Sequence, residues 1–434
     1  MKTATKTKFK QTELGMIPED WEVSNLGEVA DILAGFPFKG DKYSDKGIRV
    51  LRGENVSIGF LRWDTEKRWN HSLEGLDKYR LADSDIVVGM DGSRVGQNRA
   101  KIKNSDLPLL LAQRVARVRA KPPLDQGFLY YVIFSDKFFS HVEAVRTGTS
   151  VPHISSSQIG ELKLTIPTPF EQHYISKILS DLDSKIELNQ QMNNTLESMG
   201  RAIFKHWFVD FEFPNEKGKP YKTSGGAMTY NEELGREMPK GWELGTLGDL
   251  SELNPESWSE TTAPKEINYV DLSNTKWGKI EQTQRYLWED APSRAQRVLR
   301  PGDTIIGTVR PGNGSFSLVG EKGLTGSTGF AVLRPHKETY EKYVYIVSTS
   351  AENIERLSHL ADGAAYPAVR PDVVLATQTL LPPESLMQRF ASVVNPIMIK
   401  IIYNDRESRT LDALRDVLLQ KLMSGKIRVP TEVR

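Results

Sequence analysis

The sequence contains one module written twice, and this duplication constrains the fold more than any other feature. The segment from Pro18 to Gly27 returns as the segment from Pro239 to Gly248, with its proline, tryptophan, glutamate and Leu-Gly pair at the same spacing. Further along, Asp85 to Gly89 is matched by Asp303 to Gly307. A repeat this long indicates two similar domains in tandem, because solenoid repeats recur every 20–50 residues or so. Such a chain has an approximate internal symmetry that its partners should share.

Size and composition set broad limits on the class of protein. At 434 residues the chain can hold two or three domains, each with its own core. It has no apolar run of about 18 residues, and its Lys/Thr-rich start lacks the apolar centre of a signal peptide. The absence of cysteine excludes disulfides, thiolate zinc sites and cysteine nucleophiles. We therefore expect a cytoplasmic protein that does not contact a membrane.

Charge is informative through its distribution. The net charge is only +1, but the stretch from Arg94 to Lys121 carries eight basic residues and the single acid Asp106. The equivalent stretch of the second repeat, Arg285 to Arg310, carries five arginines against three acids. Basic patches at equivalent places suit a polyanion, while a solvated charged face is the alternative interpretation.

Each repeat begins with a mixed α/β part, residues 1–168 and 238–383. Short apolar runs bounded by Gly, Asn, Asp and Ser predict strands, and helical spacing predicts helices over Phe128 to Val145 and Tyr340 to Leu360. The predicted strands include Arg49 to Leu51, Asp85 to Val88, Ala116 to Val118, Ile267 to Val270, Thr304 to Ile306 and Phe330 to Leu333. The expected fold class is α+β.

Each repeat ends in a long predicted helix, residues 169–209 and 384–425. The first has heptad a positions at Ile175, Leu182, Asn189, Leu196 and Ile203, and d positions at Ile178, Lys185, Met192 and Met199, with Leu179 and Ile186 widening the stripe. The second has its apolar stripe at Phe390, Val394, Ile397, Ile401, Asn404, Ser408, Leu411, Leu418 and Leu422. Repeat equivalence and heptad phase predict that the two helices pair with each other as a coiled coil. If they pair as an antiparallel coiled coil, they set a fixed distance between the two mixed α/β parts. A connector, residues 210–237, joins the repeats, and residues 426–434 form a tail.

Asn189 and Asn404 occupy equivalent heptad positions. A polar residue in the seam weakens a coiled coil but fixes its register, so replacement by Leu should tighten the pair and loosen the register. The alternative is that both asparagines face solvent. Pro396 predicts that the second helix is bent there or begins near Asn395, because proline breaks a helical hydrogen bond.

A search for catalytic constellations returns none. Asn254 to Ser257 lacks the second proline and the aromatic residue of an amino-methyltransferase motif, and no Gly-rich cofactor loop precedes it. The Gly-rich turns match neither a dinucleotide nor a phosphate loop, and the seven histidines have no metal-ligand spacing. We expect a protein that is not an enzyme and that binds no cofactor itself.

What remains suits recognition of DNA. In both repeats a Gly-rich loop with arginine follows a strand, and Arg, Asn, Gln and Ser are the side chains that read base edges or contact phosphates. The copies share their scaffold residues and differ at neighbouring side chains, as two readers of different sequences would. The candidate DNA-contacting residues are Arg52, Ser93, Arg94, Gln97, Asn98, Arg99, Arg114, Arg117, Ser150 and His153 in the first repeat, and Arg310, Asn313, Ser315, Thr328 and Tyr366 in the second.

These features resemble the specificity subunits of Type I restriction-modification systems. The resemblance covers nearly the whole chain and rests on its two-fold layout and on the following motifs: Ile17 to Trp21, Gly148 to Ile154, Ile166 to Gln172, Met238 to Trp242 and Leu380 to Pro383. The second repeat departs from the family pattern at Gly363 to Pro367 and at Glu384 to Gln388.

The resemblance implies two target-recognition domains, each reading one half of a split, asymmetric sequence in double-stranded DNA. It implies that the paired helices fix the distance between the domains and dock two modification (methyltransferase) subunits, which restriction/translocase subunits join. S-adenosylmethionine, ATP and Mg would then belong to the partner subunits. A coiled-coil interaction scaffold that reads no DNA sequence is the alternative, and a stand-alone methyltransferase or nuclease is disfavoured by the missing motifs.

Overall fold

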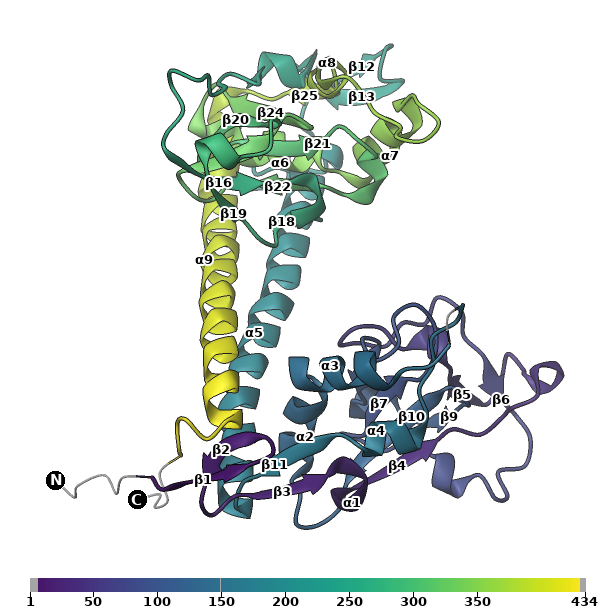
Figure 1. The fold of residues 1–434 in the computed structure, drawn as a ribbon. Coiled ribbons are helices and arrows are strands. Elements are labelled where there is room, and N and C mark those ends of the chain that lie inside the picture. Colours follow the sequence, from purple (N-terminus) through teal and green to yellow (C-terminus); the bar gives the residue numbers. More distant parts are fainter. Residues whose placement is uncertain (1–6, 149, 430–434) are drawn as a thin grey trace. The chain divides into compact units, whose positions relative to one another are not determined.

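A computed structural model describes residues 7–148 and 150–429. Thr149 of the Gly148 to Ile154 motif, the start of the predicted first domain and the end of the predicted tail lie outside the described residues. The chain divides into two compact units (Figure 1). Unit 1 comprises Met1–Glu187 and Ser408–Arg434, and unit 2 comprises Leu188–Glu407. Each unit therefore combines one mixed α/β part with segments of both long helices.

Unit 1 contains eleven strands and four short helices among its described residues, besides the long helices. The strands are β1 (Phe9–Thr12), β2 (Gly15–Pro18), β3 (Glu22–Asn25), β4 (Ala30–Ala34), β5 (Ile48–Leu51), β6 (Arg68–Trp69), β7 (Ile86–Gly89), β8 (Arg99–Lys101), β9 (Leu109–Leu111), β10 (Val115–Ala120) and β11 (Lys163–Ile166). The helices are α1 (Leu26–Val29), α2 (Gln126–Ile133), α3 (Asp136–Val145) and α4 (Ser156–Gly160).

Unit 2 contains fourteen strands and three short α-helices among its described residues, besides the long helices. Its strands are β12 (Met228–Asn231), β13 (Arg236–Pro239), β14 (Glu243–Thr246), β15 (Ser251–Leu253), β16 (Glu266–Val270), β17 (Thr275–Lys276), β18 (Lys279–Ile280), β19 (Gln284–Leu287), β20 (Ala295–Leu299), β21 (Thr304–Gly307), β22 (Phe316–Leu318), β23 (Leu324–Ser327), β24 (Phe330–Pro335) and β25 (Gln378–Leu381). Its short helices are α6 (Glu341–Ser348), α7 (Ala351–Leu360) and α8 (Pro371–Leu375).

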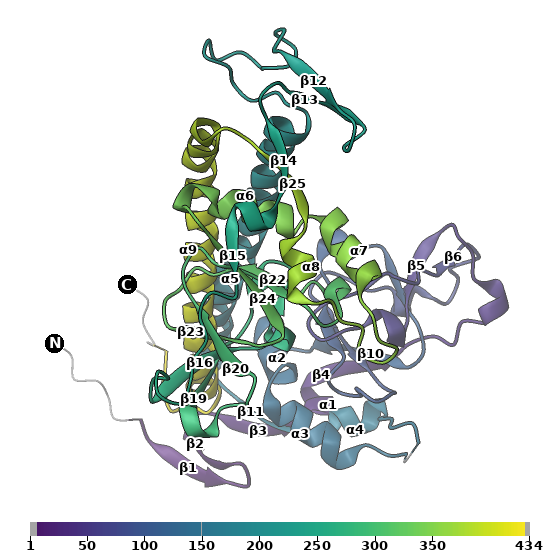
Figure 2. The ribbon, with the colours of Figure 1, turned by 90° about the horizontal axis from the view of Figure 1, so that it is seen from above.

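Most sheets of unit 1 have a counterpart in unit 2. The four-stranded sheet β4-β10-β7-β8 has its counterpart in β15-β24-β21-β22. In the second sheet of each unit one pair is parallel, β5 with β9 and β16 with β23. The two-stranded sheets β1-β2 and β11-β3 are matched by β12-β13 and β14-β25, and Figure 2 shows β12 and β13 as a separate ribbon of unit 2. All six strands predicted from sequence are present within one or two residues.

Each predicted inner helix is two helices, because a serine caps a new one. Ser135 accepts a hydrogen bond from the backbone N–H of Phe138 and begins α3, and Ser350 accepts one from Asn353 and begins α7. A serine hydroxyl at this position satisfies a backbone donor that would otherwise lack a partner, which favours a helix start. The prediction of single helices over Phe128 to Val145 and Tyr340 to Leu360 was wrong in this respect.

The repeated tryptophans are core residues. Trp21 is fully buried and its Nε1–H donates to Glu171 Oε2 at 2.9 Å, and the guanidinium of Arg428 also binds Glu171. In unit 2 the ring of Trp242 is stacked on Phe213, with 5.4 Å between ring centroids. The segment that follows one long helix thus packs on the tryptophan in each unit.

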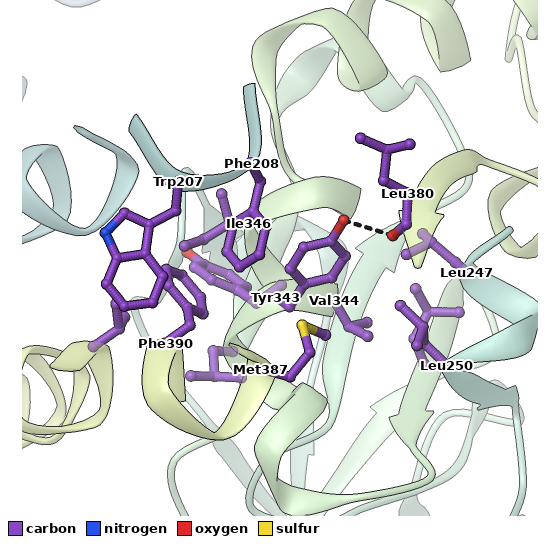
Figure 3. Packing of buried hydrophobic residues seen from close by; sticks show 14 of the residues in the cluster. Trp207, Phe208, Leu247, Leu250, Tyr343, Val344, Ile346, Leu380, Met387 and Phe390 are labelled. Atoms are coloured by element: carbon purple, nitrogen blue, oxygen red, sulfur yellow. Dashed lines mark hydrogen bonds between the residues drawn. The ribbon is translucent and has the colours of Figure 1, made fainter. Parts of the chain in front are cut away.

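The main core of unit 2 joins the α/β part to both long helices. Phe208 packs edge-on against Tyr343 and Phe390, with centroid distances of 4.9 Å in both pairs. Tyr343 Oη donates to the carbonyl oxygen of Leu380 at 2.7 Å, drawn as the dashed line in Figure 3. Large apolar surfaces buried this way supply most of the stabilisation of a domain.

Both predicted long helices are present, as α5 (Pro169–Phe204) and α9 (Glu384–Met423). A π-helical turn, Lys205–Val209, extends α5. Pro396 lies inside α9, so the expectation that this helix begins near Asn395 was wrong. No helix within the described ranges has the length and apolar character needed to cross a bilayer.

The contact stripe of α5 differs from the predicted heptad at its d positions. The predicted d residues Ile178 and Met199 are exposed. The buried residues include Leu179, which was expected to widen the stripe, and Asn193, one position after the predicted d residue Met192. The seam therefore runs through the predicted a positions and the residues four positions after each of them. On α9 the predicted stripe is confirmed in its buried members Phe390, Val394, Asn404, Ser408 and Leu422.

Candidate nucleic-acid interface

In unit 1, three loops are joined at one end of the four-stranded sheet. The backbone N–H of Met90 donates to the carbonyl of Arg114 at 2.8 Å, and that of Ile154 donates to Met90 at 2.9 Å. The N–H of Gly92 donates to Pro152 at 3.0 Å. Each of these bonds joins a backbone N–H of one loop to a backbone carbonyl of another. The loops after β7, before β10 and before α4 are therefore held in fixed positions relative to one another, an arrangement that we call the frame.

Unit 2 has the same frame with the same bonds. The N–H of Thr308 donates to Gly329 at 2.8 Å, that of Val369 donates to Thr308 at 2.9 Å, and that of Arg310 donates to Pro367 at 2.7 Å. The bridge between Asp91 and His153 in unit 1 likewise corresponds to the bridge between Val309 and Ala368. The frame positions hold different side chains in the two units, so the backbone is shared and the chemistry is not.

Arg114 is a largely exposed arginine of the unit 1 frame. Its φ is 69°, and its Nη1 donates to Asp91 Oδ2 at 2.6 Å with 66% of the side chain exposed. Arg52, at the start of the 3-10 turn Gly53–Asn55, is less accessible: it donates to the carbonyl of Thr65 at 3.1 Å and pairs with Glu54. Both lie near the frame, since a Cβ on Gly53 would meet Asp91 Oδ1 at 3.4 Å.

The loop after β7 presents Ser93 and Arg94 to solvent, and Gln97 and Asn98 are half-buried. The side chain of Arg94 has no hydrogen bond or ion pair to any described residue, so its guanidinium is available to a ligand. Ser150 and His153 lie in the facing loop and are exposed. His153 Nε2 is 3.1 Å from Thr147 Oγ1, a contact within its own loop.

Two predicted site residues, Arg117 and Arg99, use their guanidinium groups in contacts within unit 1. Arg117 is 5% exposed, donates to the carbonyl of Lys78 at 2.9 Å and pairs with Asp31. Arg99 donates to the carbonyl of Gly96 at 2.8 Å, and its guanidinium lies over the ring of Phe134 at 5.3 Å. Burial lowers the pKa of Arg99, since the charged form loses hydration. These guanidinium groups stabilise the fold, and no local sequence pattern separates Arg99 and Arg117 from Arg94.

Arg310 is the clearest candidate in unit 2. It has a left-handed backbone conformation, with φ 48° and ψ 61°. Its Nη2 donates to the carbonyl of Ala365 at 2.8 Å, and its guanidinium lies 4.8 Å above the ring centre of Tyr366, which is 72% exposed. The structure therefore brings Arg310 and Tyr366 together as a preformed cation–π pair at the surface.

The other candidates of unit 2 differ in accessibility. Asn313 is exposed in the 3-10 turn Pro311–Asn313. Ser315 is only 8% exposed, and its hydroxyl donates to the carbonyl of Leu272 at 3.0 Å. Thr328 is half-buried, and its backbone N–H donates to the backbone carbonyl of Arg294 at 2.7 Å. Asn313 thus joins Arg310 at the surface, while Ser315 holds the loop.

Much of the local basicity found in the sequence is neutralised by ion pairs. Arg119 makes two hydrogen bonds to the buried carboxylate of Asp85, at 2.7 and 2.8 Å, and these bonds raise the pKa of Arg119. Arg334 binds Asp303 in the same way, at 2.8 Å twice. Asp85 and Asp303 open the matching segments of the repeat, so this part of the motif is structural. Within the described ranges, no three His, Cys, Asp or Glu residues cluster as metal ligands.

Comparison with known proteins supports the resemblance seen in the sequence. Residues 18–198 match the family model described as the Type I restriction modification DNA specificity domain. The chain is 24% identical to the type I restriction enzyme MjaIX specificity subunit of Methanocaldococcus jannaschii, over 98% of this chain and 97% of that protein. The MjaVIII specificity subunit of the same organism is 32% identical over 45% of this chain and 47% of that protein.

One solved structure has the same fold over almost the whole length. The crystal structure of the Type I restriction-modification system S subunit from M. genitalium aligns with 95% of this chain and 97% of its own, with a TM-score of 0.57 and 17% identity. At this identity the likeness concerns the fold.

Proposed function

Because the chain belongs to the family of Type I restriction-modification specificity subunits, we propose that it reads a bipartite, asymmetric DNA sequence, one half with each mixed α/β part. A specificity subunit is the non-catalytic, DNA-recognising component of such a system. In this proposal residues 1–168 and 238–383 are the two target-recognition domains.

The observation that carries the proposal is the shared loop frame with unlike side chains. Arg114 in unit 1 corresponds to Gly329 in unit 2, and Gly92 corresponds to Arg310, because the same backbone bonds are made at each pair of positions. A conserved backbone frame places a side chain at the same point of a duplex, and the identity of that side chain selects the base. Two frames with different side chains therefore suit two different half-sites.

The long helices would separate the two readers as an antiparallel coiled coil. In unit 2, Asn189 Nδ2 lies 3.4 Å from the carbonyl oxygen of Asn404, Asn193 Nδ2 lies 3.3 Å from that of Ile401, and Gly200 faces Val394. Residue numbers fall along α9 as they rise along α5, as an antiparallel pair requires. A buried asparagine layer of this kind fixes register, and register fixes spacing.

The same layout would serve assembly. Two equivalent units offer two equivalent docking surfaces, which suits two copies of one modification subunit. Restriction/translocase subunits would then join the complex, and S-adenosylmethionine, ATP and Mg would be bound by those partners. This part of the proposal rests on the family and on the internal correspondence of the two units.

Mapping methylated adenines in DNA from cells that carry this chain with its cognate modification subunit tests the proposal. The expected result is one motif made of two unlike halves separated by a constant number of unspecified bases. Detection of no motif, or of a motif that is a single uninterrupted block, would contradict it.

A binding measurement separates a DNA reader from a protein scaffold. The assembled complex should bind duplex DNA with an affinity that falls as salt rises, because phosphate contacts release counterions. A scaffold that only joins proteins would show no such slope.

A further inference from the structure

Two hairpins at equivalent places expose large apolar side chains. In unit 2, β17 and β18 form a hairpin whose tip carries Trp277, with 62% of this residue exposed. In unit 1, a bridge between Val56 and Leu61 closes a similar hairpin, and its tip exposes Ile58 by 52% and Phe60 by 58%. Exposed apolar groups at matching positions of both repeats indicate a contact surface.

Both tips are fixed beside the candidate loops. The N–H of Gly278 donates to the carbonyl of Phe316 at 2.9 Å, and the N–H of Gly59 donates to the backbone carbonyl of Arg99 at 2.8 Å. Phe316 and Arg99 begin the strands that follow the loops with Arg310 and Arg94, respectively. Each apolar tip therefore lies next to the exposed arginine loop of its own unit.

Trp277 is held in an unusual conformation. Its φ is 47°, in the left-handed region that bulky residues avoid. Its N–H donates to the carbonyl of Gly314 at 2.7 Å, and its ring packs on Gly314 so closely that a Cβ there would come within 2.6 Å of it. The ring also meets Phe316 edge-on at 5.8 Å. An exposed aromatic kept rigid against backbone strain is a feature of functional sites.

The charges around Trp277 favour a polyanion. The tip reads Thr275-Lys276-Trp277-Gly278-Lys279, with Lys276 exposed and Lys279 half-buried. Neither lysine forms an ion pair with a described residue. An aromatic ring between two cations can pack on bases while the ammonium groups contact phosphates.

We propose that the apolar hairpin tips, Trp277 in unit 2 and Ile58 with Phe60 in unit 1, pack against the bases of duplex DNA beside the half-site read by the same unit. Lys276 and Lys279 contact the neighbouring phosphates. This inference rests on the proposed function and adds a positioning residue to each half-site. The preformed loop next to each tip supplies the polar contacts, and the tip supplies shape-dependent apolar contact.

A protein segment is the other occupant to consider. Trp277 also lines a groove of about 670 Å³ whose wall includes Phe204, Ile346 and Ile354. Acidic Glu197 and Glu352 line this groove together with Arg201 and Lys205, so its charges are mixed. The unpaired lysines lie at the hairpin tip, which favours DNA as the partner of Trp277.

The test uses the complex of this chain with its modification subunits and a duplex that carries the methylation motif. Trp277→Ala should weaken binding to this duplex by roughly 5- to 100-fold, the range expected for loss of one base–aromatic stack. Trp277→Phe should keep most of the affinity. Tyr230→Ala, which removes a 63% exposed aromatic from β12, should have no effect.

A position-specific readout shows which half-site is contacted. With 2-aminopurine placed in turn around each half, Trp277→Ala should abolish the fluorescence change at one step beside the second half only. Phe60→Ala should act beside the first half only. Thermal unfolding of each variant checks that the fold is retained.

Three outcomes would overturn the inference. In the first, the DNA affinity and the methylation motif are unchanged in Trp277→Ala. In the second, the 2-aminopurine fluorescence change persists in this variant. In the third, the variant binds the modification subunits poorly, but the fraction that does assemble contacts DNA normally. The last result would assign the tip to the protein groove. If the complex with the natural sequence has no bipartite motif, the proposed function fails instead, so the two failures are distinguishable.

Discussion

Gly92 and Arg310 occupy the same backbone position in the two units. Gly92 has φ 90° and donates its N–H to Pro152 at 3.0 Å, and Arg310 has φ 48° and donates its N–H to Pro367 at 2.7 Å. Glycine adopts positive φ without a steric penalty, whereas a residue with a Cβ is destabilised there by about 1–2 kcal/mol. Unit 2 thus carries a strained arginine where unit 1 carries the unstrained residue, which is expected if the side chain serves binding.

Replacement of Arg310 by glycine should separate stability from function. The Arg310→Gly variant loses the backbone strain and only exposed contacts, so its free energy of unfolding should stay the same or rise by up to about 1 kcal/mol. Binding to the target duplex should weaken, with relaxed discrimination in the second half-site. Urea unfolding and competition binding measure the two effects. A stability loss beyond about 2 kcal/mol would mean that Arg310 is structural.

Arg94 and Arg117 should behave oppositely although both lie in the basic stretch of the first repeat. Arg94→Ala removes an exposed side chain, so stability should change by less than about 0.5 kcal/mol. Its DNA affinity should fall by about 1–3 kcal/mol if Arg94 reads a base, with the methylation motif relaxed in the first half only.

The matched variant Arg117→Met should lower stability, because Asp31 and the carbonyl of Lys78 lose their donor. It should leave the motif unchanged. Chemical denaturation and methylation mapping of both variants check this pair, and equal relaxation of both half-sites by Arg94→Ala would contradict the assignment of one domain to one half.

Single replacement of a seam asparagine should destabilise the helix pair. Asn404 Nδ2 donates to Asn193 Oδ1 at 2.8 Å, and Asn189 Nδ2 donates to Glu407 Oε2 at 2.8 Å. A leucine at 404 leaves Asn193 Oδ1 without this donor in a buried site, at a cost of about 1–3 kcal/mol. For one asparagine alone, this hydrogen bond therefore predicts a weaker helix pair, whereas the heptad position alone predicted a tighter one.

The control for Asn404→Leu is Asn194, an exposed asparagine on the partner helix α5, where leucine should have little effect. Thermal unfolding gives the stability, and the spacing between methylated half-sites reports the register. A variant as stable as the natural protein and with unchanged spacing would remove any role of Asn404 in fixing the distance.

The contact between Asp20 and Arg428 should make unit 1 sensitive to acid. Hydrogen bonds from Arg428 hold the pKa of Asp20 below its usual value of 3.8. A carboxylate with a lowered pKa in the folded state contributes stability that is fully present above the unfolded value and is lost as pH falls through the folded value. The free energy of unfolding should therefore fall more steeply below about pH 4 in the natural protein than in Asp20→Asn.

The neighbouring Glu19 provides the comparison for this pH dependence. Glu19 is exposed, and its side chain makes no hydrogen bond or ion pair with a described residue, so Glu19→Gln should leave the slope unchanged. Unfolding curves between about pH 3 and pH 6 for the three proteins measure the difference. Identical slopes in Asp20→Asn and the natural protein would show that the ion pair contributes nothing to the stability of unit 1.

Local patterns were sufficient to predict six of the strands and both long helices of this chain. The strand segments were found because short runs of buried apolar residues, such as Ile86 to Gly89, are bounded by turn formers. On α5 the d assignment of Ile178 was wrong, although its neighbour Leu179 was expected to widen the stripe. Both residues are apolar, and only tertiary packing decides which of them is buried. The breaks before α3 and α7 were missed, although Ser135 and Ser350 are residues that favour a helix start.

The candidate site could be narrowed only by tertiary contacts. Arg94 and Arg117 have the same side chain and belong to the same basic stretch. Arg94 lies in the loop after β7, and Arg117 lies in β10. The guanidinium of Arg117 is already bound within the fold, because it donates to Asp31 and to the carbonyl of Lys78, two residues distant from it in sequence. The apolar hairpin tip at Trp277 was missed because Lys-Trp-Gly-Lys carries no motif, and its exposure depends on the packing of Gly278 and Gly314 around it.

The sequence by itself determined that this protein is two copies of one module, each ending in a long helix, because periodicity and repeated residues are properties of the chain alone. The tertiary structure decided which members of a chemically uniform set face solvent. That choice depends on which distant acids, carbonyls and rings come together to bury or neutralise a side chain. For Gly92 and Arg310, only the shared backbone conformation shows that a glycine and an arginine occupy the same position.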